Sequence, residues 1–313
     1  QIRPAVSQSH SALRSAFSAD SAADLLDATK FAETILSAQR VFLDMSAQSV
    51  SDADQARLTY EEMAPYYDAF SAHHDHKAWC ESLLPILDRH GLSGSRLLDL
   101  GCGTGKSFLP LLEAGGWQIT ACDLSPAMLS VAAGKTNGDV RLEVADLRAL
   151  PVFGQFDLVW SLGDVVNYML KPGQLEDCLA GMGANLAERG LLLFDPNTIR
   201  TYRTWYGQTH VMERDGLRLI WRGRASAAFQ AGDEAEAVFE VERLEEETGR
   251  PLRSSTHRQR HFPPEVIVAA LEEGGLECRG VYGQGLDGVL EEPLDEERHT
   301  KAIFIASRAQ KDS

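Results

Sequence analysis

The sequence has few cysteines and no long apolar run, and both absences restrict the class of protein. Its five cysteines are odd in number and form no C-x-x-C pair, which argues against a disulfide framework and a cysteine-rich zinc site. No apolar run approaches the roughly 18 residues of a membrane span, and the Ser/Ala-rich start lacks the charged-then-apolar order of a signal peptide. We therefore expect a cytoplasmic protein without a membrane partner.

Basic residues are also scarce. The chain of 313 residues has 30 Lys and Arg against 46 Asp and Glu, which gives a formal net charge of −16. Nucleic acid is not an expected partner, because binding a polyanion relies on basic side chains that displace counterions from phosphates. The acidic balance suits small molecules or cationic partners better, although solubility alone is its simplest explanation.

Short apolar runs alternate with helical patterns from residue 96 onward. The runs are RLLDL (96–100), WQITAC (117–122), VRLEV (140–144), FDLVW (156–160) and GLLLFD (190–195). Five buried strands separated by helices predict a parallel sheet with helices on both faces. A helix over 264–274 and two further strands, 276–283 and 301–307, complete this pattern.

Two other segments depart from that pattern. Partly alternating runs at 217–225, 235–244 and 252–262 predict an antiparallel meander inserted into the sheet domain. Apolar residues between 25 and 42 recur at helical spacing outside it. We expect an N-terminal helical extension (1–57), an α/β domain (58–200 and 262–313) and an antiparallel β lid inserted at 201–261.

The stretch LLDLGCGTGKS, residues 97–107, contains two incomplete phosphate-binding motifs. A P-loop that ends at Gly105 requires a glycine at position 100, which is Leu. A dinucleotide fingerprint that begins at Gly101 requires its third glycine at position 106, which is Lys. An ATP or NAD enzyme is therefore not indicated. We read Lys106 and Ser107 as helix residues that face solvent.

What remains in this stretch is an acid at a strand end followed by alternate glycines. The carboxylate of Asp99 would repel a pyrophosphate and suits a cationic group. The glycines let the backbone approach a ligand closely. LLDLGCGTG resembles the first motif of the class I S-adenosylmethionine-dependent methyltransferases. In that family the motif holds the methionine part of the cofactor, a role that the resemblance gives to Asp99, Gly101, Gly103 and Gly105.

The resemblance extends over roughly residues 60–307 and implies a Rossmann-like doubly wound sheet of seven strands, the last one antiparallel. Asp123 ends the second strand, where an acid can accept hydrogen bonds from both ribose hydroxyls. After the third strand, Asp146 and the amide of Leu147 resemble the adenine-binding corner, and Ser161 joins them after the fourth. Any one of these acids alone could be an ordinary helix cap. Three at successive strand ends favour S-adenosyl-L-methionine.

Residues on the acceptor side should follow the fourth and fifth strands, since methyl transfer needs positioning and, where required, proton removal. Asp164 and Asn167 could hold an amine or hydroxyl, or could cap the connection. Upstream, Tyr67-Asp68 resembles a pair whose tyrosine folds over the cofactor, although aromatic packing would also explain it. We take Tyr67, Asp164 and Asn167 as the catalytic candidates.

Histidines form two further groups. His73, His74 and His76 lack partners with ligand spacing, so no metal is expected, while a role as general base stays open. In the insert, Arg258 and Arg260 should share one strand face, opposite His257 and His261. One face is either a lid over the acceptor or a solvated surface.

The expected function is methyl transfer to a nitrogen or oxygen of a small-molecule metabolite. The placement of the insert is similar to that in sugar N-methyltransferases and glycine N-methyltransferase. In those proteins the insert covers the active site and often contacts a second subunit, so a homodimer is a possible assembly. The rival interpretation is a non-catalytic module that kept the cofactor fold to bind a partner. The intact trio of Asp99, Asp123 and Asp146 argues against it.

Overall fold

A computed structural model describes residues 52–245 and 251–309. Its main sheet has eight strands in the order β11-β10-β12-β5-β4-β1-β2-β3. The strands are β1 (Arg96–Leu100), β2 (Gln118–Asp123), β3 (Arg141–Val144), β4 (Phe156–Ser161), β5 (Leu186–Phe194), β10 (Leu276–Gln284), β11 (Leu290–Glu291) and β12 (Lys301–Arg308). Strands β1 to β5 are parallel where they pair, and β12 runs antiparallel to both β5 and β10.

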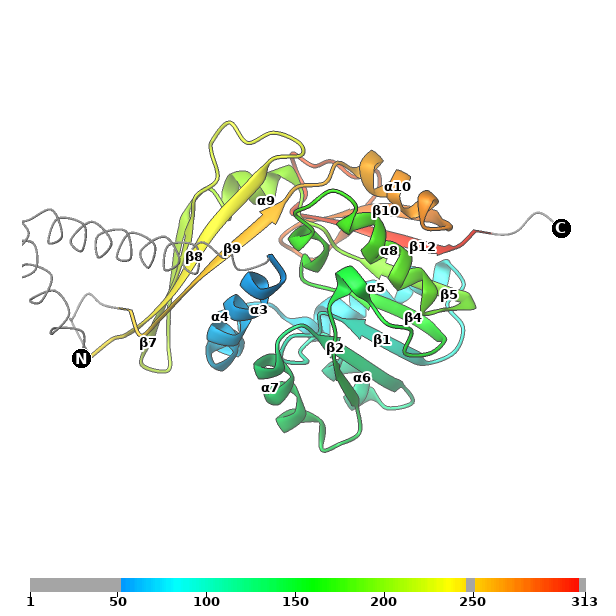
Figure 1. Cartoon of the computed structure of the whole chain (residues 1–313), viewed down its shortest axis with the longest axis horizontal. Coiled ribbons are helices and arrows are strands. Elements are labelled where there is room, and N and C mark those ends of the chain that lie inside the picture. Colours follow the sequence, from blue (N-terminus) through cyan, green and yellow to red (C-terminus); the bar gives the residue numbers. More distant parts are fainter. Residues whose placement is uncertain (1–51, 246–250, 310–313) are drawn as a thin grey trace, which may run out of the picture. The chain divides into compact units, whose positions relative to one another are not determined.

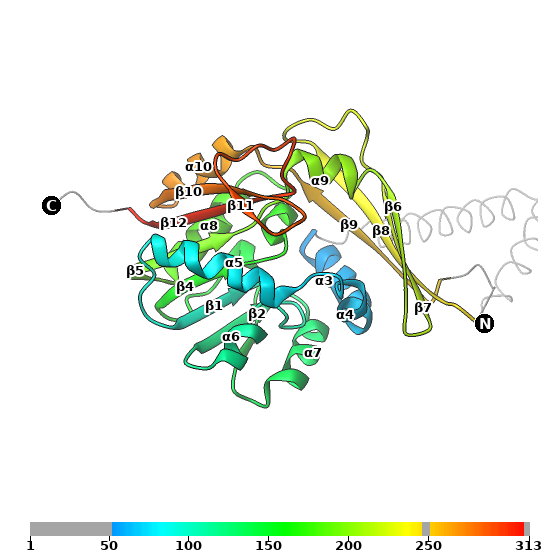
Figure 2. The same ribbon diagram turned by 180° about the vertical axis from the view of Figure 1, so that it is seen from behind.

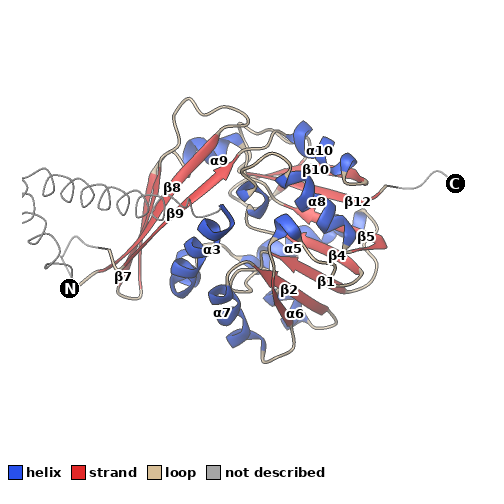
Figure 3. Cartoon of the chain, in the orientation of Figure 1, coloured by secondary structure: helices blue, strands red, loops and turns tan. Residues whose placement is uncertain are grey.

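Helices cover both faces of this sheet (Figures 1 and 3). The helices are α5 (His76–Arg89), α6 (Leu109–Ala114), α7 (Pro126–Thr136), α8 (Gln174–Ala184) and α10 (Pro264–Glu273). Alternate residues of a strand point to opposite faces, so Leu98 packs with α8 and α10 while Leu97 packs with α5, α6 and α7. Ser125 caps α7, since its hydroxyl accepts from Met128 N at 3.3 Å.

A second, antiparallel sheet follows β5 and the helix α9 (Ile199–Thr204). Its strands are β6 (Thr209–Arg214), β7 (Leu217–Gly223), β8 (Glu234–Arg243) and β9 (Arg253–Arg260). The inner face is apolar and includes Trp221 and Phe239. The outer face carries cross-strand ion pairs such as Arg222 with Glu240 (2.6 Å) and Arg224 with Glu236 (2.7 Å).

The segment before α5 lies between the two sheets, as both views show (Figures 1 and 2). It consists of α3 (Asp52–Met63), the 3₁₀ turn η1 (Ala64–Tyr66) and α4 (Tyr67–Phe70). Met63 and Ala64 belong to the apolar cluster under the antiparallel sheet. Two further 3₁₀ turns, η2 (Leu147–Ala149) and η3 (Val165–Tyr168), follow β3 and β4.

The predicted fold class is confirmed, with differences at two strands. Seven strands lie in the predicted arrangement, and the eighth, β11, is only two residues long. The insert has four strands because 209–214 pairs with β7, a segment that we had not predicted as a strand. The helix expected over 25–42 lies outside the described residues, and the division at 57, 200 and 261 stays a prediction. Among the described helices, none combines the length and apolar character needed to cross a bilayer.

Candidate active site

Asp99 is the last residue but one of β1, and its carboxylate is fully buried. Its Oδ2 accepts from Ser107 Oγ at 2.5 Å, whereas Oδ1 has no hydrogen-bond partner among the described residues. Burial raises the pKa of Asp99 to about 7, because a carboxylate removed from water loses solvation. The side chain of Trp160 lies close enough to lower the pKa of Asp99, and Oδ1 keeps lone pairs that a donor of a ligand could use.

Glycine is required at two positions of the loop after β1, for a different structural reason at each. At Gly101, φ is +69°, and a Cβ atom would lie 2.8 Å from the Val165 side chain. Gly101 therefore serves close packing. At Gly103, φ is +53° and the nearest side-chain atom to an added Cβ belongs to Tyr67, 3.9 Å away. The loop thus presents backbone, without side chains, to the segment that carries Tyr67.

Asp123 ends β2 and is also buried. Its Oδ2 accepts from Gly103 N and its Oδ1 from Ser125 N, each at 2.8 Å. Burial raises its pKa to about 6, against the opposing effect of these amides. The side chain therefore fixes the glycine loop and keeps lone pairs for further donors, since each carboxylate oxygen can accept two hydrogen bonds.

Asp146 and Ser161 stand at the next strand ends. Asp146 Oδ1 accepts from Arg148 N (3.0 Å) and Arg148 Nε (2.7 Å), which leaves Oδ2 for a ligand. Leu147, which opens η2, is buried. Ser161 Oγ donates to Leu100 O at 2.9 Å, so its hydroxyl proton ties β4 to β1.

Lys106 and Ser107 do not face solvent, which corrects our prediction. Helix α6 begins only at Leu109, so both residues lie in the turn that folds back against the end of β1. Ser107 is buried against Asp99. Lys106 Nζ donates to Ser71 O (2.8 Å) and Ser71 Oγ (3.0 Å). Lys106 thereby ties the segment after α4 to the glycine loop.

Asp68 adds a second tie between this segment and the loop. Its Oδ1 accepts from Thr104 Oγ1 at 2.6 Å, and its Oδ2 pairs with Lys135 Nζ at 2.6 Å. These contacts bring the neighbouring Tyr67 to the glycine loop. Tyr67 Oη makes no hydrogen bond to another group in the described part of the chain. Burial, and then the charges of Asp164 and Asp123, raise its pKa.

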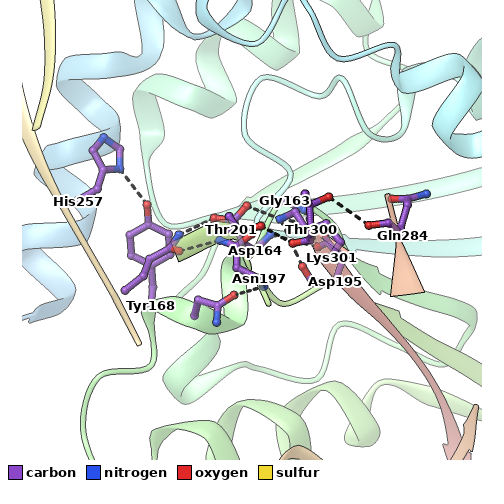
Figure 4. A network of polar contacts seen from close by, with 12 residues as sticks. Gly163, Asp164, Tyr168, Asp195, Asn197, Thr201, His257, Gln284, Thr300 and Lys301 are labelled. Atoms are coloured by element: carbon purple, nitrogen blue, oxygen red, sulfur yellow. Dashed lines mark hydrogen bonds and ion pairs between the residues drawn. The ribbon is translucent and has the colours of Figure 1, made fainter. Parts of the chain in front are cut away.

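Asp164 belongs to an ion cluster at the ends of β4 and β5 (Figure 4). Its Oδ1 pairs with Lys301 Nζ at 2.6 Å, and its Oδ2 accepts from Gln259 Nε2 of the insert at 2.5 Å. Asp195 Oδ2 lies 3.2 Å from the same Lys301 Nζ, while its Oδ1 accepts from Gly163 N at 2.7 Å. Burial raises the pKa of Asp195 to about 6 although Lys301 opposes this.

Asn167 joins three parts of the fold. Its Nδ2 donates to Arg260 O at 2.8 Å, and its Oδ1 accepts from Asn197 N at 2.9 Å. The side chain is fully buried. This geometry suits a residue that positions the insert against the end of β5, and its catalytic role stays a prediction.

The insert presents its two faces as the alternation predicts. His257 and His261 are buried, whereas Arg258 and Arg260 both pair with Glu234 on the outer side, at 2.9 and 2.6 Å. The outer face is therefore a solvated surface, and the inner face turns towards the crevice.

His73 and His74 are exposed. No group of three or more His, Cys, Asp or Glu side chains within 52–245 and 251–309 is arranged to bind a metal ion.

Sequence reasoning missed Lys301 and Gln259. Both reach Asp164 from distant parts of the chain, across 137 and 95 residues. The one local signal was a lysine that opens an otherwise apolar strand, KAIFIAS. A buried lysine at a strand end needs an anionic partner, and that partner could have been sought at neighbouring strand ends.

The carboxylates of Asp99, Asp123 and Asp146 lie at or just after the ends of β1, β2 and β3 and offer hydrogen-bond acceptors along one edge of the sheet. Residues 97–190 match the family model described as a methyltransferase domain. A relative in Bacillus subtilis (strain 168), YqeM, provisionally named a methyltransferase, is 26% identical over 74% of this chain and 91% of its own length. The chain is an S-adenosylmethionine-dependent methyltransferase. S-adenosyl-L-methionine is its cofactor, so a non-catalytic module is not supported.

Solved structures share the fold of this methyltransferase. An S-adenosylmethionine-dependent methyltransferase from Clostridium acetobutylicum ATCC 824 has a TM-score of 0.65 at 22% identity, covering 79% of this chain and 97% of that one. CalS10, an amino pentose methyltransferase from Micromonospora echinaspora solved with the cofactor bound, has a TM-score of 0.57 at 22% identity, covering 78% of this chain and 97% of that one.

Proposed function

We propose that this methyltransferase acts on a nitrogen or oxygen of a small-molecule metabolite. The observation that carries the proposal is the position of Tyr67. Its ring lies 3.9 Å from the position that a Cβ atom at Gly103 would occupy, and 6.4 Å, between ring centroids, from Tyr60, which hydrogen-bonds Tyr168 after β4. Tyr67 therefore stands between the glycine loop, where the cofactor would bind, and the residues after β4, which could position an acceptor.

The contacts between the insert and the residues after β4 also favour a small acceptor. The inner face of the insert contributes Gln259 to the cluster around Asp164, and its outer arginines are neutralised by glutamates. The pairing of Arg222, Arg224, Arg258 and Arg260 lowers the attraction of this face for a polyanion. Among proteins of the same fold, CalS10 is an amino pentose methyltransferase and KedS8 a sugar N-methyltransferase.

We assign the cofactor contacts by residue. Asp99 would face the ammonium of the methionine part, and the backbone at Gly101, Gly103 and Gly105 would line it. Asp123 would accept from the ribose hydroxyls, Asp146 from the adenine amino group and the Leu147 amide would donate to a ring nitrogen. Tyr67 would cover the cofactor, and Ser161 would close its floor. The bound cofactor supplies an electrophilic methyl group, and the protein orients the acceptor towards it.

The acceptor class can be tested with cofactor that carries a labelled methyl group. Purified protein is incubated with this cofactor and a cell extract, and the products are separated by size. We expect label in the fraction of small molecules, and much less transfer by an Asp123→Ala variant at a cofactor concentration near the wild-type Kd. Label found solely in protein or nucleic acid would contradict the proposal.

Cofactor affinity should depend on pH through Asp99. Its carboxyl is protonated below about pH 7 and then offers no negative charge to an ammonium. We expect S-adenosylhomocysteine to bind about tenfold more tightly at pH 8 than at pH 6, measured by calorimetry. 5′-Methylthioadenosine lacks the amino acid part, so its affinity should rise less between pH 6 and pH 8. An equal rise in affinity for both ligands would argue against the assignment of Asp99.

In the protein without cofactor, ionisation of Asp99 lowers the folding stability instead of improving binding. A carboxyl whose pKa is raised by folding contributes stability below its unfolded value, and this contribution is lost as the pH rises through about 7. Cofactor binding offsets that loss, because the ammonium stabilises the charged form. The ligand-induced rise in melting temperature should therefore grow between pH 6 and pH 8.

A further inference from the structure

Three side chains from distant parts of the chain form a hydrogen-bonded row beside the crevice. Tyr60 Oη in α3 donates to Tyr168 Oη in η3 at 2.8 Å. Tyr168 Oη lies 2.9 Å from His257 Nδ1 in β9, and Figure 4 shows Tyr168 directed at that ring. The row therefore runs from the segment over the glycine loop to the inner face of the insert.

The row has a defined direction. Since Tyr168 Oη accepts the proton of Tyr60, its own proton is directed to the acceptor within reach, His257 Nδ1. The imidazole then carries its proton on Nε2, which lies 3.5 Å from Ser255 Oγ. Burial lowers the pKa of His257 to about 4, so the ring is neutral and its Nδ1 lone pair is available at neutral pH.

The Tyr60 end of the row lies beside Tyr67. The Tyr60 ring lies 6.4 Å from the ring of Tyr67, and the charge of Asp164 acts on both. Because Tyr60 Oη donates its only proton to Tyr168 Oη, it can only accept a hydrogen bond from a ligand. A molecule bound beside Tyr67 therefore meets a hydrogen-bond acceptor at this point.

We propose that Tyr60, Tyr168 and His257 form a relay that removes the proton of the methyl acceptor. The inference rests on the proposed function, since it concerns the acceptor side of the same crevice. A lone pair of the acceptor forms the bond to the methyl carbon, and the electron pair of the broken carbon–sulfur bond stays on sulfur. The acceptor's proton passes to Tyr60 Oη as the Tyr60 proton moves to Tyr168 and the Tyr168 proton moves to His257 Nδ1.

Burial disfavours the imidazolium form of His257, so the ring can hold the proton only transiently. The charge of Asp164 partly offsets this effect of burial. The other groups that face the ring are uncharged: Tyr60 and Tyr168, Trp221 of β7 at 4.9 Å between ring centroids, and Ser255 of its own strand. When the product leaves, the proton returns along the row to water entering the crevice.

The relay narrows the substrate class. It serves an acceptor that carries its own exchangeable proton, such as a hydroxyl or a primary or secondary amine. Methylation of a hydroxyl is helped most by the relay, because the proton on its oxygen becomes strongly acidic as the bond to the methyl carbon forms. A tertiary amine has no proton to give and would leave the Tyr60 oxygen without a donor, which costs binding.

The direction of the row can be tested without any acceptor. Protein labelled with ¹⁵N in its histidines is titrated by NMR, and the His257 signals are assigned by their loss in a His257→Gln variant. We expect a proton on Nε2, none on Nδ1, and a neutral ring down to about pH 5. The Nδ1 signal should shift in Tyr168→Phe. A proton on Nδ1, or a ring that becomes charged near pH 6.5, would overturn the proposal.

The catalytic role is tested with glycine, ethanolamine, glucosamine and catechol as probe acceptors, by release of S-adenosylhomocysteine at saturating cofactor. For the probe that wild type methylates best, Tyr168→Phe should lower kcat by about 100-fold with S-adenosylhomocysteine affinity unchanged. The matched control is Tyr202→Phe. Tyr202 is buried in the apolar cluster against which Tyr60 packs, and its hydroxyl contacts Arg260 O and Gln259 outside the row.

The outcomes separate the relay from the proposed function. Equal effects of Tyr168→Phe and Tyr202→Phe on kcat would reduce the row to a packing element and overturn the relay. Methylation of these probes by wild type would still support a small-molecule acceptor in that case. A wild type that methylates none of them would count against the proposed function, whereas the NMR titration would still decide the relay.

Discussion

Replacing Lys301 by Met should destabilise the protein by about 3–5 kcal/mol at pH 8. Lys301 Nζ is the cation shared by Asp164 (2.6 Å) and Asp195 (3.2 Å). Removing it leaves two carboxylates close together, one of them completely buried. The free energy of unfolding, measured by urea denaturation, should report this loss directly.

The pH dependence identifies the cause. The pKa of Asp195 is already raised to about 6 and rises further without the lysine, so the variant takes up a proton at pH 5 and loses less stability there. Lys77→Met on the exposed side of α5 is the control and should change stability by less than about 0.5 kcal/mol. The double variant Lys301→Met/Asp164→Asn should recover part of the loss. A loss below about 1 kcal/mol at pH 8 would show that the cluster is well solvated.

Replacing Asp123 by Ala should weaken S-adenosylhomocysteine binding by about 1.5–3 kcal/mol, or roughly 10- to 150-fold. Two hydroxyl hydrogen bonds to a carboxylate are lost from a buried site. The contacts with Gly103 N and Ser125 N are lost as well, so the glycine loop is less well fixed. Calorimetric titration of the purified variant measures the change.

Asp123→Asn separates these two effects. The amide keeps one acceptor oxygen and the side-chain volume but removes the charge and one acceptor position. We expect its affinity to lie between those of wild type and Asp123→Ala. Its melting temperature should also fall, because the amide nitrogen would face either Gly103 N or Ser125 N, and neither can donate to it. An unchanged affinity in Asp123→Ala would contradict the ribose assignment.

The elements of the main sheet were predictable because their signals are local. Continuous apolar runs with an acid or glycine at the end define β1, β2 and β4, and Ser125-Pro126 marks the start of α7. Strand β6 was missed because THVMER is short and largely exposed, so burial imposes little apolar alternation on it. Its pairing with β7 decides its structure.

The cofactor side of the site was more accessible to sequence reasoning than the acceptor side. Asp99, Asp123 and Asp146 each follow a strand of one parallel sheet, and strand order alone places them along one edge. The partners of Asp164 come from β9 and β12, and those of Tyr168 from α3 and β9. No local pattern encodes such contacts, because they depend on how the insert folds back over the sheet.

The ties between residues 68–71 and the glycine loop have a consequence for exchange of the cofactor. Asp68 and Lys135 are partly exposed, and an ion pair of this kind contributes only about 0–1 kcal/mol and weakens with salt. Added salt should therefore weaken the ionic part of this attachment. It should leave the packing of Phe70 against Trp221 and Phe239 in place, at 5.8 and 5.0 Å between ring centroids, so salt can ease exchange of the cofactor without unfolding either sheet.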